Sequence, residues 1–189
     1  MSDIEIETHK IVAIGFSRPK KWKVFSWLIM AVERTNYSHS FVTWKDENIQ
    51  RRKIFEAVGA GVRIIGNILF KQKAEITEIY NFKVSEEVVI WLEQYAHDQS
   101  GKPYGYKHVI GLLLMRIYSA FGFKIANPFK DGDYSQICVE AGAYVLEKGL
   151  GVDLPGNVED YGLREYRALV AKYGDALPCE KIEAINGRV

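Results

Sequence analysis

The pattern of apolar and polar positions divides the chain into a strand-rich first half and a helix-rich second half. Short apolar or alternating runs, typical of strands, dominate up to residue 84, with one helical stretch among them. Beyond it, apolar residues recur at three- and four-residue spacing, as in amphipathic helices. The predicted strands are 11–16, 38–44, 49–58, 61–65 and 74–84, and the predicted helices are 23–33, 86–100, 106–121, 134–148 and 159–172. This segregation predicts an α+β fold rather than a doubly wound α/β sheet.

Two segments are unusually rich in apolar and aromatic residues. The predicted helix 23–33 places Val24, Trp27, Leu28 and Ala31 on one stripe, and residues 109–123 are almost continuously apolar. We expect the aromatic side chains Trp22, Phe25 and Trp27 to lie in the core. The alternative is contact with a lipid or a membrane surface.

Length and composition fit one compact domain. The 189 residues are 48% hydrophobic, which excludes a disordered chain, and we expect a single domain over 1–189. Its core is predicted at about 12–163, with a C-terminal helix and tail at 159–189. The net charge of +1 predicts no nucleic-acid partner on bulk electrostatics. The sequence does not indicate an oligomeric state.

Targeting signals are not evident in the sequence. The acidic, polar N-terminus does not resemble a secretory signal, and no apolar run reaches the roughly 20 residues of a membrane-spanning helix. We therefore expect a cytoplasmic protein, with release by cell lysis as a further possibility. Thiols stay reduced in the cytosol, so a structural bridge between Cys138 and Cys179 is not expected.

Cys138 is the first candidate for chemistry. It is predicted near the beginning of the helix 134–148, where the positive end of the helix dipole lowers the pKa of a thiol. The alternative is a buried cysteine that packs as a small apolar residue. Cys179 lies in a polar tail after Pro178, and we assign it no role.

His39 and Glu56 are the second and third candidates. His39 lies on the predicted strand 38–44, and Glu56 lies on the returning strand 49–58. A turn centred on residues 47–48 would place the two side chains directly opposite each other, about 5 Å apart at Cβ. A carboxylate in that position fixes the tautomer of an imidazole and raises its basicity. Both residues could instead be structural.

Cofactor and metal signals are weak. No histidine or cysteine pair has the HExxH or CxxC spacing of a zinc site, and no glycine-rich phosphate loop opens a helix. The sequence thus predicts neither a cofactor nor a metal ion.

The order of short motifs resembles a known superfamily. Ser38-His39, Phe55-Glu56-Ala57 followed by Gly61-Val62, a GKPYG segment at 101–105, and a helix-borne Cys138 follow one another along the chain. This order is similar to that of the circularly permuted papain-like enzymes of the NlpC superfamily, in which the histidine strand precedes the cysteine helix. The closest groups are YiiX-like cysteine hydrolases, with lecithin–retinol acyltransferase-like proteins as relatives.

The resemblance implies a permuted papain-like fold and a cysteine hydrolase. It implies Cys138 as the nucleophile, His39 as the general base and Glu56 as the third member, with Tyr104 near the bound substrate. The sequence departs from the family pattern in Val139, where many members have serine, and in the long segment between Gly66 and Gly101.

The expected reaction is cleavage of an amide, such as a peptide, an isopeptide or a cell-wall stem peptide, through a thioester. Two alternatives remain open. The same dyad could serve a lipid acyltransferase or lipase, or the fold could be an inactive binding protein.

Overall fold

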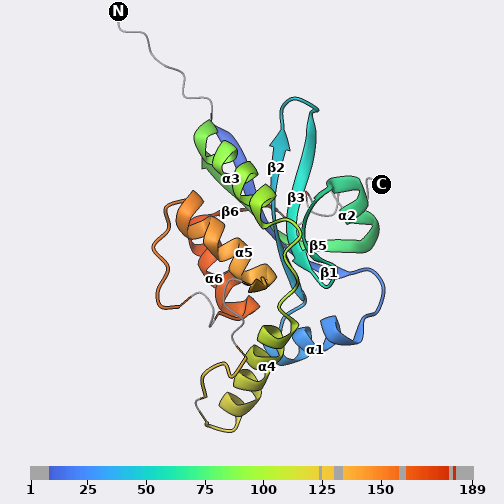
Figure 1. The fold of residues 1–189 in the computed structure, drawn as a ribbon, viewed down its shortest axis with the longest axis vertical. Coiled ribbons are helices and arrows are strands. Elements are labelled where there is room, and N and C mark those ends of the chain that lie inside the picture. Colours follow the sequence, from blue (N-terminus) through green and yellow to red (C-terminus); the bar gives the residue numbers. More distant parts are fainter. Residues whose placement is uncertain (1–8, 124, 130–133, 158–160, 179–180, 182–189) are drawn as a thin grey trace, which may run out of the picture.

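A computed structural model describes residues 9–123, 125–129, 134–157, 161–178 and 181. Its centre is an antiparallel sheet of six strands in the order β4-β3-β2-β1-β5-β6. The long strands cross the middle of the molecule in Figure 1. The strands are β1 (Lys10–Pro19), β2 (His39–Asp46), β3 (Arg51–Val58), β4 (Gly61–Gly66), β5 (Ala74–Val84) and β6 (Asp175–Ala176).

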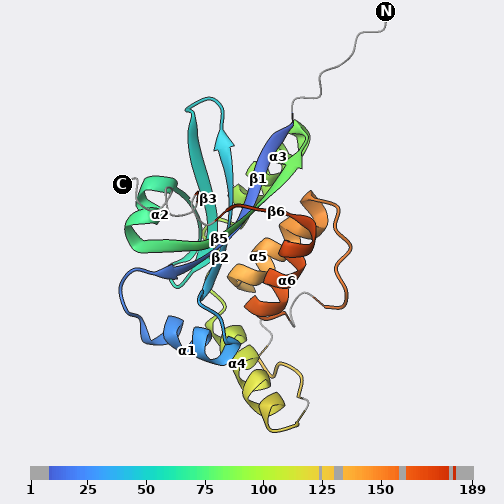
Figure 2. The same cartoon turned by 180° about the vertical axis from the view of Figure 1, so that it is seen from behind.

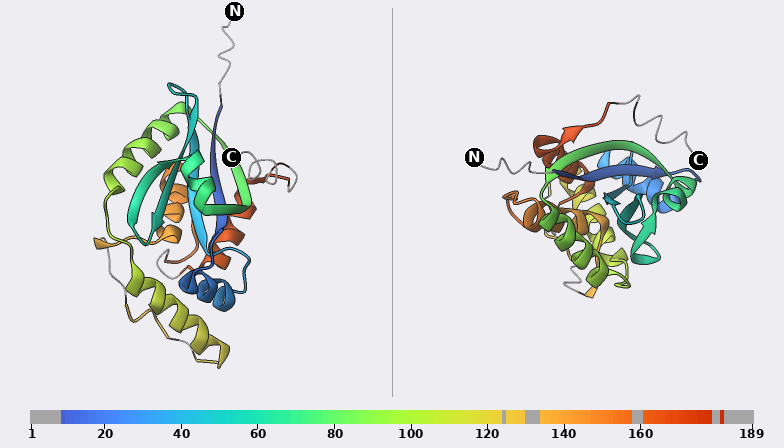
Figure 3. Two further views of the ribbon diagram at one scale, coloured as in Figure 1. Left: turned by 90° about the vertical axis from the view of Figure 1, so that its right-hand side faces the viewer. Right: turned by 90° about the horizontal axis from the view of Figure 1, so that it is seen from above.

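Helices cover both faces of this sheet unequally. On one face lie α3 (Glu86–Gln99), α5 (Cys138–Tyr144) with its π-helical continuation η2 (Val145–Gly149), and α6 (Leu163–Tyr173), as Figure 2 shows from behind. The short α2 (Asn67–Lys73) packs on the other face. The remaining helices, α1 (Val24–Glu33) and α4 (Tyr106–Ala120), lie side by side at one end of the molecule (Figure 3).

Two hydrophobic clusters follow from this layering. The larger one lies between the sheet and α3, α5 and α6, and includes the fully buried Trp44, Leu92 and Tyr166. The smaller one lies beneath α2, where Phe41 and Phe70 pack with their ring centroids 4.6 Å apart. Because β2 is buried on both faces, its first residue is held firmly at the edge of the core.

Much of the predicted fold is confirmed. The five predicted strands and five predicted helices are present in the predicted order, which makes the protein α+β. The segment between Gly66 and Gly101, which departs from the family pattern, contributes β5, which pairs along its length with β1 and lies between β1 and the short β6. The sequence pattern did not predict α2 or the two-residue β6.

Two predictions about helices are wrong. The cysteine helix begins at Cys138 rather than at residue 134, so the thiol belongs to its first helical residue. Two of the aromatic residues expected in the core lie outside it: Trp22 is 75% and Trp27 is 55% exposed. The stripe of α1 that carries Trp27 faces outward, while Ile29 and Glu33 are buried. The periodicity was correct, but it marked the unpartnered face of the helix.

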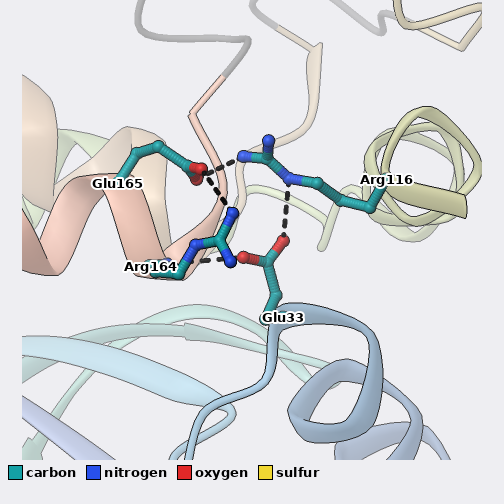
Figure 4. A network of polar contacts seen from close by, with 4 residues as sticks. All are labelled: Glu33, Arg116, Arg164 and Glu165. Carbon is teal, nitrogen blue, oxygen red and sulfur yellow. Dashed lines mark hydrogen bonds and ion pairs between the residues drawn. The ribbon is translucent and has the colours of Figure 1, made fainter. Parts of the chain in front are cut away.

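An ion-pair network ties α1 and α4 to α6. Glu33 is almost fully buried and accepts a hydrogen bond from Arg116 Nε at 3.4 Å and one from the Arg164 backbone N–H at 3.4 Å. Arg116 and Arg164 both contact Glu165 (Figure 4). Burial raises the pKa of Glu33, although the charge of Arg116 opposes that shift.

None of the described helices is both long enough and apolar enough to cross a bilayer.

Candidate active site

Cys138 is the first residue of α5, and this helix packs against β2 and β3. Cys138 is only 6% exposed. The hydroxyl of the buried Ser40 on β2 donates a hydrogen bond to the Cys138 carbonyl oxygen at 3.0 Å. This contact joins the beginning of the helix to the strand that also carries His39.

His39 is the first residue of β2 and lies opposite Ser17 of β1. Its imidazole interacts with the thiol of Cys138, and the interaction shifts the pKa of both groups. Its Nε2 lies 3.1 Å from Glu56 Oε2. Because Nε2 is engaged by the carboxylate, Nδ1 is the ring nitrogen left for the thiol. Three of the predicted site residues are therefore in contact.

The contact between His39 and Glu56 arises from a register different from the predicted one. Val42 pairs with Phe55 and Trp44 pairs with Lys53, which shifts β3 by two residues relative to the prediction. His39 and Glu56 are therefore diagonal rather than directly opposite. A shift of two residues keeps every side chain on its predicted face, so the pair still meets.

Arg63 is a site residue that sequence reasoning missed. It lies opposite Glu56 on β4, and its Nε and Nη2 donate to Glu56 Oε1 at 2.9 and 2.5 Å. Glu56 is 3% exposed, so this second cation is important for keeping the carboxylate ionised. The two-residue turn Gly59-Ala60 between β3 and β4 was the available signal, because it sets the register that places Arg63 beside Glu56.

The pKa values of the three contacting residues shift in complementary directions. Burial opposes ionisation of the Cys138 thiol, but its hydrogen bond to His39 and the charge of the imidazolium outweigh burial and lower the pKa. Burial likewise disfavours protonated His39, yet hydrogen bonds to Cys138 and Glu56 raise its pKa. The pKa of Glu56 is lowered because His39 and Arg63 overcome its burial. These directions favour a thiolate–imidazolium pair.

A second polar cluster fixes the beginning of α5. Glu140 Oε2 accepts a hydrogen bond from the Ile137 backbone N–H at 2.9 Å, and Glu140 Oε1 lies 2.9 Å from Nδ1 of the buried His108 on α4. A carboxylate in the first turn satisfies a backbone donor that the helix leaves open. Cys138 is therefore held by side chains on both sides of the helix start.

A cavity of about 470 Å³ adjoins this site. His39, Glu56 and Arg63 line it together with residues of α1 and α2. Tyr104, which was predicted near the substrate, lines this cavity and also a pocket of about 30 Å³ that reaches Cys138. Burial and the nearby Cys138 raise the pKa of Tyr104 well above its usual value, so its hydroxyl stays protonated.

The candidate site does not resemble a metal centre. Within the described part of the chain, no group of three or more histidine, cysteine, aspartate or glutamate side chains could hold a metal ion. Both oxygens of Glu56 are already used, one by His39 and one by Arg63. A cation would have to displace the arginine.

The fold and site thus define an α+β protein in which a cysteine at a helix start meets a histidine and a glutamate on the adjoining sheet. No family model and no curated protein matches the chain. Among solved structures it is similar to the metalloprotein YiiX from Escherichia coli O157:H7, with a TM-score of 0.51 and 20% sequence identity. The match covers 89% of this chain and 87% of that chain. This similarity shows a YiiX-like fold.

Proposed function

We propose that the protein is a cysteine hydrolase that cleaves an amide through a thioester intermediate, with Cys138 as nucleophile and His39 as general acid and base. One observation carries this proposal: the Cys138 thiol and the His39 imidazole interact and shift each other's pKa, and His39 Nε2 lies 3.1 Å from Glu56 Oε2. A nucleophile, a base and a group that orients the base form the arrangement that acyl transfer requires. The order of His39 before Cys138 agrees with a permuted papain-like enzyme.

The reaction proceeds in two acyl transfers. The Cys138 thiolate attacks the carbonyl carbon, and the protonated His39 gives its proton to the leaving amine as the C–N bond breaks. A water molecule then gives a proton to His39 and attacks the thioester. The C–S bond breaks, the acid is released, and the thiolate–imidazolium pair forms again. Backbone N–H groups at the beginning of α5 are the candidate donors to the developing oxyanion.

The residues that line the cavity indicate the chemical groups that a substrate should carry. The cavity wall contains Phe25, Ile29 and Phe70 together with the cationic side chains Lys23 and Lys73. An acyl group with an apolar part and a carboxylate or phosphate matches this combination. The apolar part of the wall also supports the second candidate, in which the same dyad cleaves or transfers a lipid ester.

A labelling experiment distinguishes an enzyme from an inactive binding protein. In a Cys179→Ser background, iodoacetamide should label Cys138 rapidly near neutral pH, and His39→Ala should slow the labelling by at least tenfold. His97→Ala is a matched control, because this exposed histidine of α3 is remote from the thiol. Slow labelling of wild type, unchanged by His39→Ala, refutes the catalytic proposal.

Substrate panels then separate the two enzymatic alternatives. Amide and ester substrates, each with and without a carboxylate, are compared on wild type and on Cys138→Ala. Cysteine-dependent turnover of esters alone would refute amide hydrolysis in favour of the lipid alternative.

A further inference from the structure

Helix α4 carries apolar residues on more than one face, but only one of these faces is buried. Val109, Leu112 and Leu113 face the core. The residues Tyr106, Ile110, Ile117, Tyr118 and Phe121 follow a second stripe, at the spacing of successive turns, and all are exposed. A contiguous patch of exposed apolar side chains marks an interaction site. The second stripe therefore points to a surface that binds another molecule.

Helix α1 adds a parallel apolar stripe beside it. Trp22, immediately before the helix, is 75% exposed, and Trp27 is 55% exposed, with Val24 and Leu28 beside it. The two helices are in contact, and the Phe25 and Tyr106 rings meet edge to face at 5.8 Å between centroids. We name these two exposed stripes, together with Phe123 after α4, the apolar end (Figures 1 and 3).

The sequence around the apolar end is mainly basic, although Arg18 is paired with Glu75 and Arg116 with Glu33 and Glu165. Segment 18–34 contains five lysines or arginines and one glutamate, and segment 102–129 contains four lysines or arginines and no acidic residue. The one glutamate, Glu33, is buried against Arg116. Lys21, Lys23 and Lys107 are exposed and form no ion pair with any described carboxylate. Since the whole chain has a net charge of only +1, positive charge is concentrated here.

The combination of exposed apolar side chains and positive charge indicates what the apolar end binds. Two copies of the chain would bring like charges together, which opposes self-association through the apolar end. Tryptophan and tyrosine side chains flanked by lysines are the residues that favour the boundary between lipid headgroups and acyl chains. A bilayer with anionic headgroups complements both the apolar side chains and the positive charge.

We propose that the apolar end docks onto the surface of a bilayer that contains anionic lipids. The cavity of the candidate active site is lined by Lys23, Phe25 and Tyr106 from the same two helices, so docking would place this cavity next to the lipid surface. The inference concerns binding and does not depend on the proposed hydrolase activity. It can be tested on the Cys138→Ala variant.

Vesicle co-sedimentation tests the proposal. The Cys138→Ala protein should bind vesicles of phosphatidylcholine with 30% phosphatidylglycerol, and bind pure phosphatidylcholine vesicles at least tenfold more weakly. Binding should fall in 0.5 M salt, which screens the headgroup charge. Lys21→Glu and Lys107→Glu should each weaken binding about fivefold or more, since each lysine near an anionic surface contributes about that factor. Lys83→Glu on β5 is the matched control and should leave binding nearly unchanged.

Tryptophan fluorescence gives a second and independent measurement. Trp22 and Trp27 should shift their emission to the blue and be quenched by brominated acyl chains, whereas Trp44 is already buried in the core. Trp27→Ser with Phe121→Ser should abolish the shift and the binding, while Ile90→Ser, at an exposed position of α3, should change neither. Absence of vesicle binding, or equal binding to neutral vesicles, overturns the proposal. A dimer that this double variant dissociates would instead identify the apolar end as a self-association surface.

Discussion

Replacement of Glu56 by glutamine should inactivate Cys138, because of the way Arg63 is placed. The substitution keeps the size of the side chain and changes only its charge and its hydrogen-bonding atoms. In the wild type, Oε1 receives two N–H groups from Arg63 and Oε2 faces His39 Nε2 at 3.1 Å. A glutamine has only one oxygen to serve both neighbours.

The single amide oxygen of the glutamine should face Arg63 rather than His39. The Arg63 guanidinium is always protonated and can only donate, so the amide oxygen of glutamine has to face it. The amide nitrogen then points at His39 Nε2, which becomes an acceptor and leaves the proton on Nδ1, the nitrogen that faces the thiol. A histidine in this tautomer cannot accept the thiol proton. Loss of the correct tautomer in a catalytic triad costs about 10⁴-fold in turnover. Alkylation needs only the thiolate, so a return of the Cys138 pKa toward its ordinary value of about 8.5 should slow labelling on the order of 10²-fold near pH 6.5.

A double variant makes this reasoning falsifiable. Arg63→Met removes the two donors, so in Glu56→Gln/Arg63→Met the amide can turn and offer its oxygen to His39. The double variant should therefore label with iodoacetamide at least tenfold faster than Glu56→Gln alone, when both are measured by mass spectrometry between pH 5 and 9. A double variant no faster than the single variant, or wild-type labelling in Glu56→Gln, would refute the tautomer argument. Circular dichroism of all variants excludes unfolding as the cause.

Three further predictions concern the supports of this site. Arg116→Met should lower the free energy of unfolding by about 3 kcal/mol at pH 7 in urea denaturation, because it leaves Glu33 buried without its main cation. The folded-state pKa of Glu33 is raised, so this loss of stability should shrink as the pH falls toward the ordinary carboxyl pKa and the side chain becomes protonated. A loss of stability that grows on acidification would contradict this. Ser40→Ala removes hydrogen bonding that lowers the pKa of Cys138, so the pH midpoint of alkylation should rise, at a stability cost of about 1 kcal/mol; an unchanged midpoint would argue against the contact. Glu140→Gln should cost about 1–3 kcal/mol, because it weakens the cap of the cysteine helix and its contact to a buried histidine, whereas an unchanged melting temperature would show that the cap contributes little.

The sequence predicted the strands and most of the site because both depend on local pattern. Alternating and continuous apolar runs located the five main strands, and a simple hairpin count brought His39 close to Glu56. The count was wrong by two residues, yet the pair still meets because side chains repeat with a period of two along a strand. An error of one residue would have placed Glu56 on the opposite face.

Other features could not be predicted from periodicity alone. A helical stripe shows which residues share a face, but not whether that face is inside, and the stripe of α1 proved to be the outer one. Helix α5 begins at Cys138, directly after Ile137, whose backbone N–H donates a hydrogen bond to Glu140. The sequence pattern had suggested a start at residue 134. The role of Arg63 depends on the pairing of β3 with β4, which sequence reasoning did not count.

Arg63 also explains how a carboxylate can serve as the third member of this site. In the proposed mechanism, His39 loses its imidazolium charge when it gives its proton to the leaving group, and without Arg63 this would leave Glu56 as an isolated buried anion. Such an ion is costly, and the usual response is to take up a proton. Arg63 remains protonated throughout and is 31% exposed, so it keeps Glu56 ionised while its own charge is partly solvated. Glu56 can thus accept the His39 N–H at every stage, and the imidazole keeps the orientation needed for the next proton transfer.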